Sequence, residues 1–152
     1  MSEMNEKIKN ALISIDFVKR YEELSKRFDS GRTPSDNRLV YIDGEEVMDM
    51  IKNLGYDPLF DAKEKFFKIK EEKTENMSFG FHIILRDGLV EMVWVVRQDK
   101  EVLLGSPFGT YAKRLIDPGY RIKNPVIGSY DDLEEILKTA FEMYEDFKKA
   151  LI

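Results

Sequence analysis

The sequence predicts an α+β fold in which an antiparallel meander of roughly four strands packs against N- and C-terminal amphipathic helices. An Asp87-Gly88 pair stands between two runs of alternating apolar residues, which is typical of a two-residue β-hairpin turn. Apolar residues also recur every three or four positions near both ends of the chain, which is the period of a helix. The length of 152 residues fits a single domain that spans 1–152.

The first predicted helix runs without interruption from Met4 to about Phe28. Its apolar stripe consists of Ile8, Ala11, Leu12, Ile15, Val18, Tyr21, Leu24 and Phe28. The next stretch, Asp29 to Asn37, contains Ser, Gly, Thr, Pro and Asn and predicts a loop. We expect a short strand at Leu39 to Ile42.

A second predicted helix begins at Asp43, which forms a capping-box pattern with Glu46. Gly55 is suited to the position just past the end of this helix. The buried stripe of the helix is Val47, Met50, Ile51 and Leu54. The segment from Pro58 to Lys63 is interpreted as a turn or one helical turn, and Phe67 and Ile69 alternate with lysines as in a strand.

The Asp87-Gly88 turn determines the register of the central hairpin. With these two residues as the loop, Arg86 faces Leu89, and side chains alternate between the two faces of the sheet. The predicted core pairs are Phe79 with Val96, Phe81 with Trp94, Ile83 with Met92, and Leu85 with Val90. The opposite, mixed face pairs Gly80 with Val95, His82 with Val93, and Ile84 with Glu91.

Beyond the hairpin, a second tight turn at Asp99-Lys100 places Val96 opposite Leu103. Gly105 to Gly109 then ends the sheet, a short helix is expected from Tyr111 to Ile116, and 120–127 is extended or irregular. Ser129, with Asp132 three positions later, predicts the start of the last helix. The stripe of that helix is Leu133, Ile136, Leu137, Ala140, Phe141, Tyr144, Phe147 and Leu151.

Composition limits the classes of function. Apolar residues make up 43% and charged residues 35% of the chain, and there is no cysteine, which excludes disulfides and thiolate metal sites. The first residues are polar, unlike a signal peptide, and no apolar run reaches the length of a membrane span. We therefore expect a cytoplasmic protein that does not bind a membrane.

Candidate catalytic chemistry is sparse in the sequence. His82 is the sole histidine, and its diagonal neighbour Glu91 is positioned to orient an imidazole, but a full catalytic constellation needs further groups. The segment from Gly105 to Thr110 matches neither the Walker pattern nor the dinucleotide fingerprint, so we interpret it as a loop. We expect no catalytic residues, no bound cofactor and no enzymatic activity.

Clusters of charged residues have structural interpretations. Neighbouring acids on one helix diverge, so helix capping explains the Asp131-Asp132 pair better than a metal site, and we expect no bound metal. A lysine stripe lies near Phe66 and Phe67 and is typical of either a single-stranded RNA surface or an edge strand protected against aggregation. This stripe contains Lys63, Lys65, Lys68, Lys70 and Lys73. We favour the edge strand and expect no nucleic-acid partner, since the net charge is −5.

Negative charge is concentrated in two regions. The stretch from Asp43 to Asp61 contains six acids against Lys52, and Ser129 to Ile152 contains seven acids against three lysines. In size and layout the chain resembles the small acidic immunity proteins of bacterial polymorphic and contact-dependent toxin systems. The resemblance covers the whole chain as a general type and assigns no role to any residue. It implies a cytoplasmic protein that neutralises a cognate toxin, often a basic nuclease, by covering its active site or substrate groove.

The favoured hypothesis from the sequence is therefore a protein-binding module that docks electrostatically onto a basic toxin domain. Tyr56 and Tyr130 are candidate exposed aromatic anchors, since binding energy concentrates in such residues. The candidate acidic contacts are Asp43, Glu45, Glu46, Asp49, Glu134, Glu135, Glu142, Glu145 and Asp146.

Two alternatives remain open at this point, and so does the choice between a monomer and a homodimer. One is a structural or regulatory module that associates with itself through the mixed sheet face around Ile84, Val93 and Val95. The other is a small-ligand-binding domain with a pocket between the sheet and the loop around Phe108.

Overall fold

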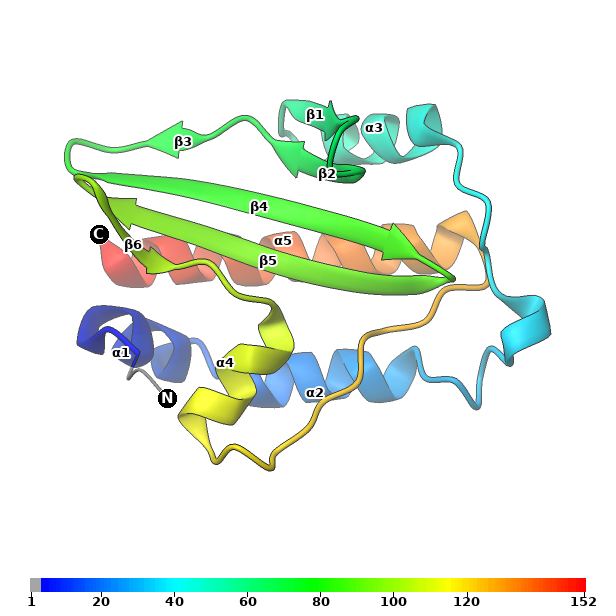
Figure 1. The fold of residues 1–152 in the computed structure, drawn as a ribbon, viewed down its shortest axis with the longest axis horizontal. Helices are drawn as coiled ribbons and strands as arrows, with labels where there is room; N and C mark the ends of the chain where they lie inside the picture. The colour runs from blue at the N-terminus through cyan, green and yellow to red at the C-terminus, as the bar shows by residue number, and fades with distance from the viewer. Residues whose placement is uncertain (1–3) are drawn as a thin grey trace.

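The computed structural model describes residues 4–152, in which an antiparallel sheet packs against a layer of helices (Figure 1). The helices are α1 (Glu6–Ser14), α2 (Phe17–Arg27), α3 (Gly44–Asn53), α4 (Phe108–Leu115) and α5 (Tyr130–Leu151), with a 3₁₀ turn at Ser35–Asn37. The strands are β1 (Pro58–Asp61), β2 (Phe66–Ile69), β3 (Glu72–Lys73), β4 (Met77–Arg86), β5 (Leu89–Gln98) and β6 (Glu101–Leu104). The sheet order is β1-β2-β4-β5-β6, and β3 also pairs with β4. The α+β class is confirmed, with six strands in place of roughly four.

The register of the β4–β5 hairpin follows from its turn. Asp87 and Gly88 both have positive φ, 54° and 78°, and Arg86 pairs with Leu89 as predicted. Every predicted pair back to Phe79 and Val96 is present. A Cβ added at Gly88 would lie 2.6 Å from the Cβ of Arg38, so both the backbone angle and the close approach of Arg38 require glycine here.

The second hairpin departs from its predicted register. The turn at Asp99-Lys100 is present, but Val96 pairs with Leu104 and not with Leu103. A β-bulge between Val96 and Arg97 shifts the ladder by one residue. The residues of the turn predicted where the chain reverses, whereas the bulge was not predicted.

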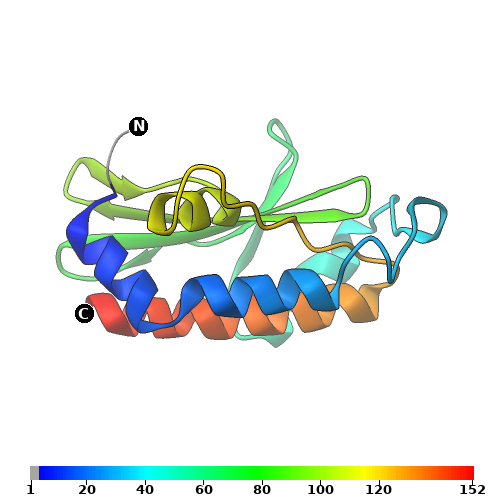
Figure 2. The ribbon, with the colours of Figure 1, turned by 90° about the horizontal axis from the view of Figure 1, so that it is seen from below.

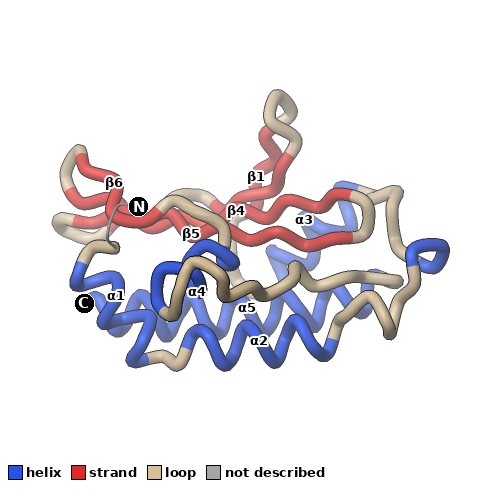
Figure 3. The backbone as a smooth tube through the Cα atoms, turned by 60° about the horizontal axis from the view of Figure 1, so that its bottom comes forward, coloured by secondary structure: helices blue, strands red, loops and turns tan. Residues whose placement is uncertain are grey.

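A layer of helices covers the apolar face of the sheet. In Figures 2 and 3, α2 and α5 lie beside each other under one side of the sheet, while the β1–β2 hairpin projects from the other side. Ion pairs join the two helices: Arg20 to Asp146 at 2.9 Å and Arg27 to Glu135 at 3.0 Å. The terminal helices therefore pack on the sheet as the sequence predicts.

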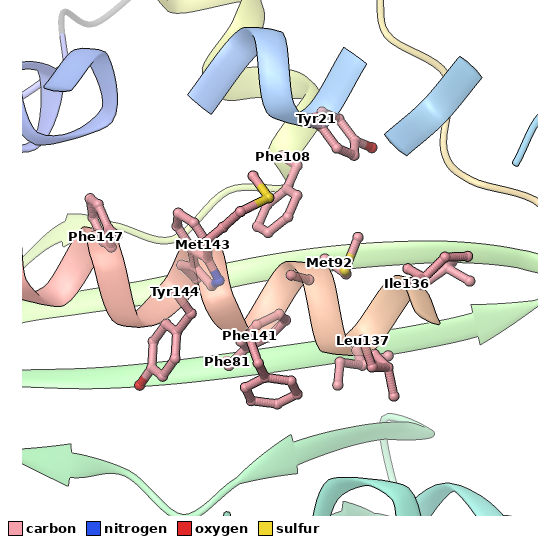
Figure 4. Packing of buried hydrophobic residues seen from close by; sticks show 14 of the residues in the cluster. Tyr21, Phe81, Met92, Phe108, Ile136, Leu137, Phe141, Met143, Tyr144 and Phe147 are labelled. Atoms are coloured by element: carbon pink, nitrogen blue, oxygen red, sulfur yellow. The ribbon is translucent and has the colours of Figure 1, made fainter. Parts of the chain in front are cut away.

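Aromatic rings fill the space between the sheet and the helices (Figure 4). Trp94 of β5 is fully buried, with its ring centroid 4.8 Å from Phe147 of α5 and 4.7 Å from Phe108 of α4. Phe81 of β4 lies 4.6 Å from Phe141 on α5. Burial of each such side chain contributes about 1.5–3 kcal/mol, so this cluster dominates the stability of the fold.

The predicted N-terminal helix is two helices. α1 ends at Ser14, and Asp16 adopts a left-handed conformation with φ of 57°. Asp tolerates this conformation better than most residues, which allows the chain to bend and place α2 along α5. The three-and-four spacing continues through the bend, so hydrophobic periodicity alone cannot detect it.

Two further predictions around α3 are wrong. Leu39 to Ile42 is not a strand, because Leu39 makes its backbone bond to Ile127 at 2.9 Å and the following residues pair with no strand. Pro58–Asp61 forms strand β1, where a turn or helical turn was expected. Pro58 is compatible with strand structure because it is the first residue of an edge strand and needs no N–H there.

The helix starts in the second half of the chain lie close to their predicted positions. α4 begins at Phe108, three residues before the predicted Tyr111, directly after Pro107. Ser129 caps α5, since its Oγ accepts the N–H of Asp132 at 3.2 Å. Between these helices, 120–127 contains no helix and only an isolated bridge from Val126 to Leu89, in agreement with the predicted extended or irregular segment.

Candidate protein-binding site

α3 presents its acidic side to solvent because its apolar side is used for packing. Val47, Met50 and Ile51 are buried against the rest of the protein. Asp43 caps the helix, with its Oδ1 accepting the N–H of Glu45 at 3.0 Å. The predicted reciprocal bond from Glu46 is not formed, because the Asp43 N–H instead donates to the Tyr130 hydroxyl at 2.8 Å. α3 is thereby fixed to the start of α5.

A groove of about 660 Å³ runs between the first turn of α3, the β1–β2 hairpin and the end of β4. Its lining residues are Ile42, Asp43, Gly44, Glu45, Met48, Phe60, Ala62, Lys65, Phe67 and Leu85. Most of these are apolar, and the two carboxylates stand at the α3 side. We call this feature the α3 groove.

Two exposed aromatic side chains belong to this region. Phe60 lines the α3 groove and is 49% exposed, and Tyr41, which precedes the lining residue Ile42, is 92% exposed. Leu59 is 45% exposed but alternates with Phe60 along β1 and lines the hollow on the mixed sheet face. Exposed apolar residues that lie together mark interaction surfaces, whereas isolated ones do not.

Sequence reasoning missed Tyr41 and Phe60 as binding candidates. Tyr41 fell in a predicted strand and Phe60 in a predicted turn, so neither was considered as an exposed aromatic. The signal in the sequence was that Tyr41 lies two residues before the cap residue Asp43 and outside both neighbouring apolar helix stripes.

The four predicted acids at α3 face solvent, and one of them, Asp43, also caps the helix. Asp43, Glu45, Glu46 and Asp49 are all exposed, and none forms an ion pair with another described residue. Glu45 and Asp49 are four positions apart on the same helix, where like charges repel. Within the described residues no cation forms an ion pair with either acid, so a basic partner would relieve this repulsion.

The acids of α5 are mostly engaged inside the protein. Asp146 and Glu135 pair with Arg20 and Arg27 of α2, and Glu145 accepts a bond from Lys148 at 2.8 Å. Partial burial raises the pKa of Glu145, but the bonds from Lys148 and Tyr56 outweigh it and hold the pKa below its usual value. The structure therefore divides the predicted acidic contacts into a free α3 set and a largely paired α5 set.

Glu134 and Glu142 are the exceptions on α5. Both are exposed, and neither makes an ion pair among residues 4–152. Because these two acids are also exposed and unpaired but lie on a different helix, charge reversal at Glu134 and Glu142 is a matched control for charge reversal on α3.

The two predicted aromatic anchors are half-buried and already bonded. The Tyr56 ring stacks on Phe141 at 4.3 Å, and its hydroxyl donates to Glu145. Burial and the bond to Glu145 raise the pKa of Tyr56. Tyr130 accepts the Asp43 N–H, as described above. The two hydroxyl groups therefore hold α3 and the segment that follows it against α5. Tyr41 and Phe60 are more exposed and are the better candidates for aromatic anchors.

His82 does not have the neighbours that acid–base chemistry requires. It pairs with Val93 and, on its other side, with Lys68 of β2, and its ring lies 4.6 Å from that of Phe66. Burial lowers its pKa, and the charges of Lys68 and Arg97 lower it further. No bond joins His82 to Glu91 in the described residues, so the proposed orienting contact is absent.

The other sequence motifs have structural roles. Phe108 in the 105–110 segment is 1% exposed, and its ring centroid lies 5.1 Å from that of Phe17, so this side chain belongs to the core. Asp132 accepts bonds from the Gly128 N–H at 2.8 Å and from Arg32 at 2.9 Å, which supports the capping interpretation. Burial raises the pKa of Asp132, but these bonds lower it to below its usual value.

The lysine stripe does not lie on one edge strand. Lys68 is on β2, which is an interior strand between β1 and β4, so the edge-strand explanation is wrong for it. Its ammonium lies 5.9 Å from the centre of the Phe66 ring. Lys63 and Lys65 lie in the turn between β1 and β2.

Within residues 4–152, no group of three or more His, Asp or Glu side chains is placed to hold a metal ion. No helix in the same range is both long and apolar enough to cross a bilayer. The chain matches no family model, and neither a curated protein nor a solved structure is found to be similar to it. The α3 groove is therefore the feature that best indicates a function.

Proposed function

We propose that the protein is a non-enzymatic, cytoplasmic binding module that holds a basic protein partner against the α3 groove. The observation that carries the proposal is the combination of four unpaired acids on α3 with a neighbouring apolar groove and exposed aromatic side chains. Protein interfaces combine apolar anchors at the centre with a charged rim that steers association.

The partner class we propose is a bacterial toxin domain, which makes the protein an immunity protein. A nuclease or another toxin that acts on a polyanion needs a basic surface for its substrate. The acids at Asp43, Glu45, Glu46 and Asp49 complement such a surface, and the groove offers a place for an apolar side chain of the toxin. Occupying the basic surface would exclude the substrate and neutralise the toxin.

Self-association is the second candidate, and it has its own supporting observation. The mixed sheet face faces away from the helical layer, and Val93, Val95 and Ile84 on it are half-buried. A shallow hollow of about 380 Å³ lies on this face beside Gly80 and His82. A stable homodimer through this face, measured by sedimentation, would favour the structural module over the toxin inhibitor.

Charge reversal on α3 tests the favoured proposal. The double variant Glu46→Lys/Asp49→Lys keeps the Asp43 cap, and we expect it to slow association with the isolated toxin domain about 10- to 100-fold at low salt. The expected reason is loss of electrostatic steering, so the rate should also become less sensitive to ionic strength. The partner to test is the C-terminal domain of a large toxin-like protein, if one is encoded directly upstream, and stopped-flow fluorescence measures the rate.

Glu134→Lys/Glu142→Lys is the matched control, since it makes the same change in net charge on α5. We expect its association rate to stay within about threefold of that of the parent, because neither acid lines the α3 groove. Equal slowing by both variants would show that only net charge matters and would contradict the α3 surface. Growth rescue in cells that express the toxin domain provides a second readout of neutralisation.

A further inference from the structure

A second groove, of about 680 Å³, has the opposite charge from the α3 groove. It lies between the end of α2, the loop that follows it and the irregular segment that connects α4 to α5 (Figure 1). Its lining residues are Ser25, Lys26, Asp29, Ser30, Arg38, Leu89, Arg121, Ile122, Lys123, Asn124 and Val126. We call it the Arg121 groove.

The walls of the Arg121 groove are fixed by hydrogen bonds. The Ser25 hydroxyl donates to the Lys123 carbonyl at 2.6 Å, and the Val126 N–H donates to the Phe28 carbonyl at 2.7 Å. The Tyr21 hydroxyl donates to Oδ1 of Asn124 at 3.2 Å. These bonds hold the 121–126 segment against α2, so the groove exists before any ligand binds and a ligand need not order it.

The floor of this groove is apolar and its rim is cationic. Ile122 and Val126 are buried, and Leu89 is half-buried. Lys26, Arg38, Arg121 and Lys123 supply four positive charges around them. Asp29 is the one acid among the lining residues, and its Oδ1 already accepts the Arg32 N–H at 2.8 Å.

Several donors at the rim remain available. The stem of Arg38 packs against Gly88 and its Nε donates to the Thr33 carbonyl at 3.4 Å, while its terminal nitrogens have no partner within residues 4–152. The amide nitrogen of Asn124 is likewise without a partner in that range, since the Tyr21 bond uses the oxygen.

Lys26 pairs with Glu22 at 3.6 Å, whereas Arg38, Arg121 and Lys123 make no ion pair within residues 4–152. These three like charges repel each other, and a bound anion would lessen that repulsion.

We propose that the Arg121 groove binds a small organic phosphate, with the phosphate at the basic rim and the apolar body on the Leu89–Ile122–Val126 floor. Guanidinium groups bind phosphate through paired, parallel hydrogen bonds, and Arg38 and Arg121 provide two of them. The volume lies in the range of small-molecule sites. The apolar floor should favour an organic phosphate over inorganic phosphate, because only the organic ligand has an apolar part that can contact the floor.

NMR titration with adenosine monophosphate tests this assignment, with adenosine, inorganic sulfate and a single-stranded oligonucleotide as comparison probes. We expect saturable shifts in the amide signals of 25–30 and 121–126 with the monophosphate, and weaker responses to adenosine and sulfate. Arg121→Ala/Lys123→Ala is expected to weaken binding at least about tenfold, since it removes two charged contacts. Both side chains are exposed, and the Ser25 bond uses the Lys123 backbone, so the fold is retained.

Lys7→Ala/Lys9→Ala on α1 makes the same change in charge and is expected to bind as the parent does, because both lysines are exposed on a separate helix. Unchanged binding by Arg121→Ala/Lys123→Ala would overturn the assignment. An equal response to sulfate, or much tighter binding of the oligonucleotide, would also overturn it, in favour of a general anion site or a nucleic-acid surface. The α3 proposal is tested separately, since Arg121→Ala/Lys123→Ala is expected to leave association with the toxin domain unchanged.

Discussion

Trp94→Ala is expected to lower the free energy of unfolding by about 3–5 kcal/mol. The indole is completely buried and lies within 5.5 Å of the rings of Phe17, Phe108 and Phe147, so its removal leaves a cavity among rigid neighbours. Its N–H has no hydrogen-bond partner in residues 4–152, so no acceptor loses a bond and the cost comes from packing alone. For a domain of this size the melting temperature should fall by about 6–20 °C in calorimetry.

Tyr41→Ala is the control for that experiment. It removes an aromatic side chain that is 92% exposed, and we expect the free energy of unfolding to change by no more than about 0.5 kcal/mol. A melting temperature of Trp94→Ala equal to that of the parent would mean that the aromatic cluster does not stabilise the fold.

The aromatic residues beside the α3 groove should dominate the affinity for the partner. We expect Tyr41→Ala and Phe60→Ala each to weaken binding to the isolated toxin domain by about 2 kcal/mol or more, or roughly 30-fold, because exposed aromatic anchors form the centres of interfaces. Isothermal titration calorimetry measures the effect. In contrast with charge reversal, the loss should appear mainly in the dissociation rate.

Val102→Ala provides a matched control, because Val102 is 55% exposed on β6, an element that contributes no residue to the α3 groove. Its affinity should equal that of the parent. If Tyr41→Ala and Phe60→Ala also bind with parental affinity, the α3 groove is not the contact surface, even if charge reversal on α3 slows association.

Much of the fold could be predicted from the sequence because short-range chemistry determined it. The Asp87-Gly88 turn requires positive φ at both positions, and alternation then assigns every side chain of β4 and β5 to one face. The errors fall where tertiary packing decides, as at the left-handed Asp16 and at the bulge after Val96. Hydrophobic spacing carries no signal for either event.

The candidate site was predictable only in part. Sequence reasoning identified Asp43 to Asp49 as acidic, but it gave the same weight to Glu135, Glu145 and Asp146. Arg20 and Arg27, which pair with two of these α5 acids, lie more than a hundred residues earlier in the chain, so only the fold reveals the neutralisation. The groove itself is formed by α3, the β1–β2 hairpin and β4 together, and no one of these segments predicts it.

The central claim is that a partner contacts the α3 groove and not the outer side of α5. Hydrogen–deuterium exchange of the protein, alone and in complex with the isolated toxin domain, tests this most directly. We predict slower exchange on binding in 40–49 and 58–65, with no change on the exposed side of α5 around Glu134 and Glu142. Protection confined to α5 or to the mixed sheet face, with 40–49 exchanging as in the free protein, would contradict the account.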